Sequence, residues 1–332
     1  MEKVSINKDS NRINYLDMAR GLAIFLVVFG HIYPNDTIRI WLYSFHIPLF
    51  FIVSGCLLNY QNEENKNMKQ IFIKKVKSLI LPYIAFSIIR LIIRMILSNF
   101  SILVIMGDLK NSIKLIGIGP MWFLPALFIA ELLFYIIRKT IKKEYLRIII
   151  IVILLCIPLL LNKNSNSMLF VLSRSFISLG FIEIGYYTYK FISKIDLPYY
   201  LIFILVIATI FLSHYNGLVD LYYLQFNVFL LYIFNAVLGS ITMILILKKC
   251  RNIKLLSFWG INSLIIMCTH SDLIAIAKKI TGNMLNGYKT GAALILVILI
   301  LEYFIIKIIN KHMPFLLGKR KKHIKTSNTI KF

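Results

Sequence analysis

Long uninterrupted blocks of apolar residues, separated by short polar stretches, make up most of the chain. The blocks at 15–33, 41–60 and 79–97 are each about 20 residues long, enough for a helix to cross a hydrocarbon core of ~30 Å. Seven further blocks follow near 121–138, 148–162, 168–189, 197–213, 221–247, 255–277 and 291–310. The pattern predicts an all-α, polytopic membrane bundle of about ten transmembrane helices.

Composition agrees with this pattern. Hydrophobic residues make up 59% of the 332 residues, charged residues 16%, and the mean hydropathy is +0.78. A typical soluble domain has about 25% charged residues. The longest predicted loops, 60–78 and 98–120, are too short to form a soluble domain. We therefore expect an N-terminal tail over 1–14, a membrane domain over 15–310 and a basic tail over 311–332.

Basic residues give the expected orientation, because cytoplasmic loops carry an excess of Lys and Arg. With the N-terminus inside, 26 of the 38 Lys and Arg fall in cytoplasmic segments, 7 in outer segments, and the rest within spans. Both termini are therefore predicted to be cytoplasmic. The first apolar block is longer than that of a secretory signal peptide and lacks a cleavage site of small residues. We expect a multi-pass protein of the plasma membrane.

The net charge of +24 follows largely from this bias and from the basic cluster Lys319–Lys322. Such a cluster favours anionic lipid headgroups by roughly 1 kcal/mol per residue. No nucleic-acid-binding module is recognisable, so the expected partners include membrane lipids and no nucleic acid. The cysteines lie in separate apolar segments without metal-ligand spacing, and no metal is expected. They are Cys56, Cys156, Cys250 and Cys268.

Polar residues inside the predicted spans are the best guide to function. A charge at the centre of a lone membrane helix costs at least ~2.5–3.5 kcal/mol, so these side chains are expected to face the interior of the bundle and to have a role there. They are Asp17, Arg20, His31, His46, Arg90, Arg94, Glu131, Arg174, Glu183, His270, Asp272 and Glu302.

Two of these residues lie on the first predicted helix. Arg20 is in its cytoplasmic half, and His31 follows eleven residues later, ~16 Å along the axis. Eleven steps of about 100° end within about 20° of the starting direction, so both side chains share one face. By the predicted topology, His46 lies near the level of His31, and Arg94 and His270 also fall in the outer half.

These residue types suggest group-transfer chemistry. Histidine, with an ordinary pKa of ~6.5, can take a proton from a hydroxyl and return it near neutral pH. Arginine binds phosphates and carboxylates through its guanidinium fork. The arrangement predicts a chemical path that runs from a cytoplasmic cation towards histidines and arginines nearer the outside.

Several segments resemble motifs of the membrane acyltransferase-3 family, in order and over most of the chain. The first carries an Arg, ten residues and a His, and the second contains Phe-His-Ile-Pro. Later segments resemble the branch that contains fucose 4-O-acetylase-like proteins, which are polysaccharide O-acetyltransferases. The matching segments are 17–31, 45–55, 74–83, 121–127 and 260–264 with His270.

The resemblance implies a ten-helix enzyme that takes an acyl group, usually acetyl, from cytoplasmic acetyl-CoA. The acceptor would be a sugar hydroxyl on a wall, capsular or lipid-linked glycan. His31 would be the catalytic histidine and Arg20 its partner. Lys74 and Lys77 stand where some members have an Arg-x-x-Arg pair, and Glu131 stands alone where many members have adjacent glutamates.

On this basis we expect His31 to act as a general base or to carry the acyl group transiently. Lys74 and Lys77, with Arg20, would hold the phosphates of acetyl-CoA, and no cofactor would stay bound. The residues expected to contact the substrate are His46, Arg90, Arg94, Trp122, Glu131 and His270.

Each assignment has a structural alternative. Trp122 fits an aromatic belt, Lys74 and Lys77 fit the positive-inside bias, and Arg90 and Arg94 fit the lining of a wet cavity. His31 fits a helix-capping or packing position at the interface, His46 fits a hydrogen-bonded helix start, and His270 fits an interfacial position. For the whole protein, the alternative is a transporter or flippase for a glycan or an organic anion, with the same residues along a cationic path.

Overall fold

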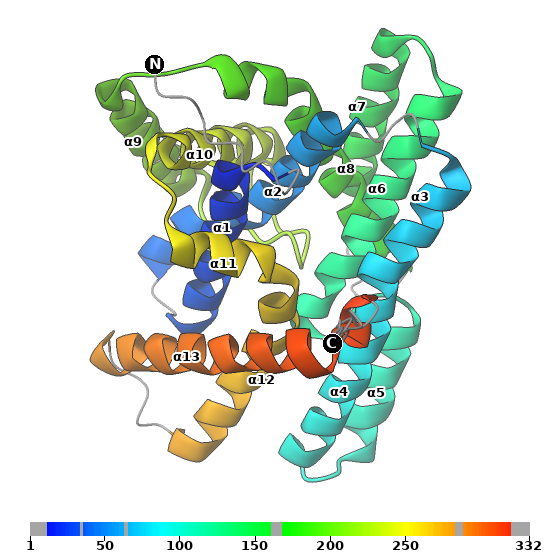
Figure 1. The fold of residues 1–332 in the computed structure, drawn as a ribbon, viewed down its shortest axis with the longest axis vertical. Coiled ribbons are helices and arrows are strands. Elements are labelled where there is room, and N and C mark those ends of the chain that lie inside the picture. Colours follow the sequence, from blue (N-terminus) through cyan, green and yellow to red (C-terminus); the bar gives the residue numbers. More distant parts are fainter. Residues whose placement is uncertain (1–11, 34–35, 63–65, 161–167, 283–287, 320–332) are drawn as a thin grey trace, which may run out of the picture.

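The computed structural model describes residues 12–33, 36–62, 66–160, 168–282 and 288–319. Over this part of the chain the regular structure is helical (Figure 1). The helices are α1 Asn14–Ile32, α2 Asp36–Gln61, α3 Met68–Lys75, the π-helix η2 Val76–Ile80, α4 Leu81–Leu97, α5 Ile102–Ile113, the 3₁₀-helix η3 Gly119–Trp122, α6 Phe123–Thr140, α7 Glu144–Leu160, α8 Met168–Lys194, α9 Tyr199–Asn216, α10 Phe229–Lys249, α11 Lys254–Ile261, α12 Ser263–Thr281, α13 Tyr288–His312 and the 3₁₀-helix η5 Pro314–Leu317.

The expected polytopic helical membrane bundle is confirmed. Among the described residues, eight helices are long and apolar enough to cross a membrane, and the bent pair α11–α12 makes a ninth. The remaining predicted span, 148–162, corresponds to α7, which has 17 described residues; its last two positions lie outside the described residues. The cytoplasmic location of the termini stays a prediction, and both tails lie mainly outside the described residues.

Both long predicted loops contain helices, which corrects the sequence-based assignment. The stretch 60–78 contributes α3 and most of η2, which continue into α4 as one 30-residue rod, Met68–Leu97. The stretch 98–120 contains α5, which pairs with α4 as a hairpin (Figure 1). Lysines on α3 and Asp108 on α5 lower the local hydropathy, which hides both helices from a search for apolar blocks.

Two later segments also differ from simple spans. The predicted span 255–277 is broken at Asn262 into α11 and α12, which meet at an angle of 85°. The Asn262 side chain donates to the Phe258 carbonyl and accepts from Asn310 on α13, so polar groups are satisfied at the break. The predicted span 221–247 begins only at Phe229, and before it a short turn closes on an antiparallel bridge between Asp220 and Gln225.

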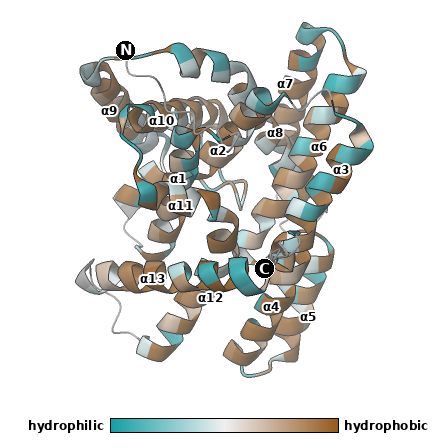
Figure 2. Cartoon of the chain, viewed as in Figure 1, coloured by the Kyte–Doolittle hydropathy of each residue, from teal (hydrophilic) through white to brown (hydrophobic). Residues whose placement is uncertain are grey.

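Large apolar side chains cover much of the outer surface, as expected for contact with lipid. Leu103 on α5 is 82% exposed and Phe211 on α9 is 70% exposed. Figure 2 shows polar residues mainly near helix ends and connections, while α5 and the lower part of α4 are strongly apolar. These helices therefore present lipid-facing sides.

Glycine pairs bring two pairs of helices into backbone contact, a common way for membrane helices to pack. On α2 and α8, an added Cβ at Gly55 would lie 1.9 Å from the Ile182 carbonyl oxygen, and one at Gly185 would lie 2.1 Å from that of Ile52. Gly21 on α1 and Gly260 on α11 meet the partner backbone in the same way. The contact of α1 with α11 sets where the following helix, α12, passes α1.

We expect Gly55→Ala to destabilise the protein by about 1–3 kcal/mol, because the added methyl group forces α2 and α8 apart. The measurement is the thermal unfolding midpoint of the purified protein in detergent. Gly107→Ala is the matched control, since Gly107 lies inside α5 with nothing within 4 Å of its added Cβ. That control should be neutral or stabilising; equal losses in the two variants would contradict this packing.

Candidate active site

A cavity of about 330 Å³ lies where α1, α2, η3, α12 and the 217–228 segment converge. His31 near the end of α1, His46 of α2 and Trp122, the last residue of η3, line this cavity. Ser271 of α12 completes another wall. The ends of α1 and α9 and the starts of α2 and α10 belong to connections that are poor in basic residues. The cavity therefore lies towards the predicted outer side of the bundle.

Two histidines, His31 and His46, line this cavity, and a third, His270, contacts His31 without lining it. The backbone bonds of all three define their tautomers. The Nδ1 atoms of His31, His46 and His270 lie 2.8, 2.6 and 2.6 Å from the carbonyl oxygens four residues earlier. A carbonyl oxygen only accepts, so each Nδ1 carries the proton and each Nε2 keeps its lone pair. His31 is exposed to the cavity, whereas His46 and His270 are buried. The accessible basic nitrogen is thus Nε2 of His31.

Helix α12 lies against α1 along the face that carries Arg20 and His31. Arg20 donates to the Ser263 hydroxyl at 3.3 Å, and the rings of His31 and His270 meet edge to face with centroids 5.1 Å apart. Because both side chains of α1 contact α12, the shared face expected from their spacing is confirmed. Arg20 of α1 contacts the first residue of α12, which lies about two turns before His270 on that helix. Arg20 does not line the cavity.

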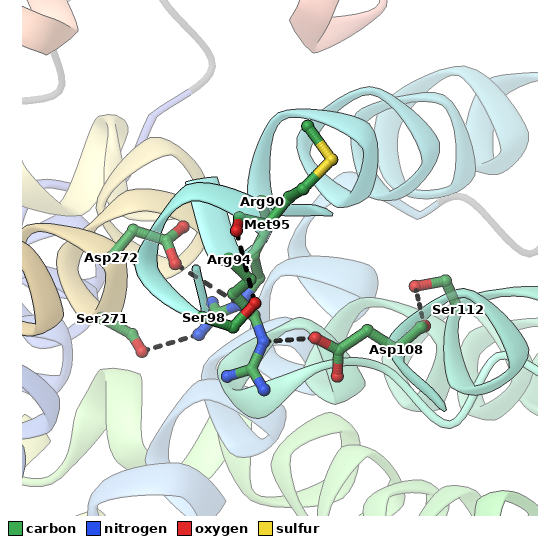
Figure 3. A network of polar contacts seen from close by, with 8 residues as sticks. All are labelled: Arg90, Arg94, Met95, Ser98, Asp108, Ser112, Ser271 and Asp272. Carbon is green, nitrogen blue, oxygen red and sulfur yellow. Dashed lines mark hydrogen bonds and ion pairs between the residues drawn. The ribbon is translucent and has the colours of Figure 1, made fainter. Parts of the chain in front are cut away.

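Arg90 and Arg94 on α4 are held in place by neighbouring helices (Figure 3). Arg90 donates to Ser271 at 2.8 Å and lies 3.5 Å from the Asp272 carboxylate, whereas Arg94 pairs with Asp108 of α5. Neither arginine is among the cavity residues. Arg90 instead supports the cavity wall from behind. It donates to the Ser271 hydroxyl, and its guanidinium lies against Gly119, and both of these residues line the cavity.

Glu131 is also placed away from the cavity. Its carboxylate lies 2.7 Å from the ammonium group of Lys75, and both side chains are buried. Lys75 belongs to the basic segment expected to meet the donor, but it faces inwards. Lys74 and Lys77, the two lysines assigned to that role, are exposed on the α3–η2 rod.

Five cavity residues with ionisable side chains are not among those predicted from sequence. Four of them are Tyr43, Asp220, Tyr222 and Tyr223, and the fifth is Arg39. Three of the five belong to the 217–228 segment. The sequence predicts this segment as the connection before the span 221–247 and the first residues of that span. The Asn-Gly pair at 216–217 and the polar Asp220 mark a turn there, and they are the signal that would have separated this segment from α10.

Arg174 of α8 holds this segment in place, although it does not line the cavity. Its guanidinium donates to the carbonyl oxygen of Tyr222 through two nitrogens, one at 2.8 Å, and to that of Ile116 at 3.1 Å. It also lies 5.1 Å from the ring centre of Trp122 and 4.2 Å from that of Tyr222. A single buried cation thus joins two loops that both contribute residues to the cavity wall.

Asp220 is the acid of the cavity. Its Oδ1 accepts the backbone N–H groups of Tyr222 at 2.8 Å and Tyr223 at 3.4 Å. Burial raises the pKa of the Asp220 carboxyl, and these two N–H groups act in the opposite direction. Within the described ranges there is no group of three or more His, Cys, Asp or Glu able to hold a metal ion.

Comparison with known proteins assigns this architecture to a family. The acyltransferase-3 model, described as an acyltransferase domain, matches residues 13–311. The chain belongs to the acyltransferase-3 family. No curated protein and no solved structure matches it. The matched range runs from the residue before α1 almost to the end of α13, so the cavity and its walls lie inside the acyltransferase domain of a membrane protein.

We expect Arg174→Lys to loosen the 217–228 segment, because an ammonium group cannot reach two loops with three N–H bonds. The readout is chymotrypsin cleavage after Tyr222 and Tyr223 in membranes, followed by mass spectrometry. Cleavage should accelerate several-fold, and the unfolding midpoint should fall by an amount corresponding to about 1–3 kcal/mol. Arg251→Lys, at an exposed arginine between α10 and α11, is the control. Unchanged cleavage in Arg174→Lys would rule out the clamp.

Proposed function

We propose that this acyltransferase is a polysaccharide O-acetyltransferase of the plasma membrane. It would move an acetyl group from cytoplasmic acetyl-CoA to a hydroxyl of a cell-surface or lipid-linked glycan. The observation that carries the proposal is the Nε2 lone pair of His31 at a cavity of about 330 Å³, inside the matched acyltransferase domain. A base at a pocket suits activation of a hydroxyl, and the pocket volume falls within the range of about 300–1,000 Å³ for small-ligand sites.

The transfer needs one basic group, and the overall reaction neither consumes nor releases a proton. Nε2 of His31 takes the proton of the acceptor hydroxyl while its oxygen attacks the thioester carbonyl. The carbon–sulfur bond then breaks, the ester stays on the acceptor, and His31 returns the proton to the sulfur of coenzyme A. In the carrier variant, Nε2 attacks the thioester, the carbon–sulfur bond breaks and coenzyme A leaves as the thiolate. The hydroxyl then takes the acetyl group from Nε2, and its proton passes through the freed Nε2 to the thiolate. The same nitrogen is required in both cases.

The neighbours of His31 are suited to orienting it. The bond from Nδ1 to the Val27 carbonyl fixes the tautomer, and the edge of His270 limits rotation of the ring. His46 lines the same cavity and lies 4.9 Å from the ring of Tyr43, measured between centroids. We assign His270 to positioning, because it is fully buried, and we assign His46 and Trp122 to the substrate walls.

The donor is proposed to approach from the other end of α1. Lys74 and Lys77 are exposed on the α3–η2 rod, and Arg20 lies deeper, so phosphates could be held by the lysines while the thioester arm passes Arg20. The ~16 Å rise from Arg20 to His31 is comparable to the reach of a pantetheine arm. Glu131 acts in this scheme through Lys75, and Arg90 and Arg94 act through the walls they hold, without touching the substrate.

The test is transfer of radiolabelled acetyl from acetyl-CoA to the glycan fraction of membranes. His31→Ala should reduce transfer at least ~100-fold, the usual size of a general-base contribution, with insertion unchanged. His214→Ala is the matched control, since His214 on α9 makes the same bond to a carbonyl four residues earlier but does not line the cavity.

Full transfer by His31→Ala would refute the mechanism. Movement of glycan across the membrane without any transfer of label would instead favour the transporter class. A loss of transfer in His214→Ala equal to that in His31→Ala would show that the effect is not specific to the cavity.

A further inference from the structure

The outer part of the cavity carries one cation and one anion that do not form an ion pair. Arg39 of α2 and Asp220 of the 217–228 segment both line it, and each lies within electrostatic range of the other. No ion pair joins them in the part of the chain that the structure describes, where a pair requires an N–O distance of 4.0 Å or less. Both charged groups therefore line the cavity without neutralising each other in a salt bridge.

Both groups keep unused hydrogen-bonding capacity. The guanidinium of Arg39 lines the cavity and lies 4.8 Å above the centre of the Tyr43 ring, and none of its N–H groups is bound to a carboxylate of a described residue. On Asp220 the two backbone N–H groups bind Oδ1, and no described residue donates to Oδ2. One wall therefore offers a donor and the other offers an acceptor.

A neutral polyol fits this pair better than an ion does. A hydroxyl group can accept from Arg39 and donate to Asp220, and neighbouring hydroxyls on one ring can do both at once. An anionic ligand would be repelled by Asp220 and a cationic ligand by Arg39. Aromatic rings of Tyr43, Trp122 and Tyr222 supply flat apolar surfaces that suit the C–H face of a pyranose ring.

We propose that the outer part of the cavity, between Arg39 and Asp220, is a subsite for one uncharged sugar ring of the acceptor, which excludes acidic and amino sugars. Its role as the acceptor subsite rests on the proposed function. The sugar ring would stack on the aromatic wall, and one of its hydroxyls would lie at Nε2 of His31. The charge selectivity itself is a property of the walls and is measurable without any transfer.

The experiment measures binding of three methyl glycosides that differ in charge: methyl glucoside, methyl glucuronide and methyl glucosaminide. The purified full chain is kept in a detergent without a sugar headgroup, and tryptophan fluorescence and saturation-transfer NMR report binding. The glucoside should bind at least tenfold more tightly than either charged glycoside. Arg39→Gln and Asp220→Asn, on opposite walls, should each weaken glucoside binding about tenfold, the loss expected for one hydrogen bond to a charged group.

Asp220→Asn should also strengthen glucuronide binding at least tenfold, because it removes the repelling carboxylate. Asp196→Asn and Arg251→Gln are matched controls at exposed positions, and they should bind as the parent protein does. If one cavity variant does not fold, the other still tests the subsite from the opposite wall.

The subsite is refuted if the parent protein binds the glucuronide as tightly as the glucoside. It is refuted too if no glycoside binds, or if both cavity variants bind like their controls. Acetyl transfer is measured in the same preparations. Charge-selective binding without transfer would overturn the proposed function and leave the sugar subsite standing, whereas transfer without charge selectivity would do the reverse.

Discussion

The structure depends on one constraint, the burial of the polar side chains of α12 inside a membrane bundle. Away from water, each such group needs a partner from another helix, because leaving it unpaired costs several kcal/mol. Ser263 meets Arg20 of α1, Thr269 meets Glu302 of α13, and Ser271 meets Arg90 of α4. A single helix thereby fixes the positions of three others, and the break at Asn262 sets its direction.

The candidate site follows from this arrangement. Because α12 is tied to α1, His270 lies against His31; because it is also tied to α4, Ser271 and Gly119 form a firm wall backed by Arg90. Arg174 supplies the opposite constraint by joining the 217–228 segment to the loop before η3. Two buried cations, Arg90 and Arg174, thus support the cavity from behind its walls, while His31, His46 and aromatic rings line it together with Arg39 and Asp220.

Sequence reasoning reached the bundle and the shared face of Arg20 and His31, because apolar block length and helical periodicity are local properties. His46 and Trp122, which are expected from the sequence to contact the substrate, line the cavity, and that role stays a prediction. It did not separate Arg90, Arg94 and Glu131, which hold walls or helices, from residues that line the cavity. Their partners Asp272, Asp108 and Lys75 lie on other helices, and only tertiary packing decides which intramembrane charges pair with one another and which face the cavity.

In the proposed reaction, acetyl passes from a donor on the cytoplasmic side, through His31, to an acceptor on the outer side. A sidedness assay uses purified protein of known orientation in liposomes, with labelled acetyl-CoA confined to one side and the glycan acceptor to the other. Labelled glycan is expected when acetyl-CoA is on the side of the basic loops, and no labelled glycan is expected in the reverse arrangement. Equal labelling in both arrangements, or none in either, would contradict the proposed reaction.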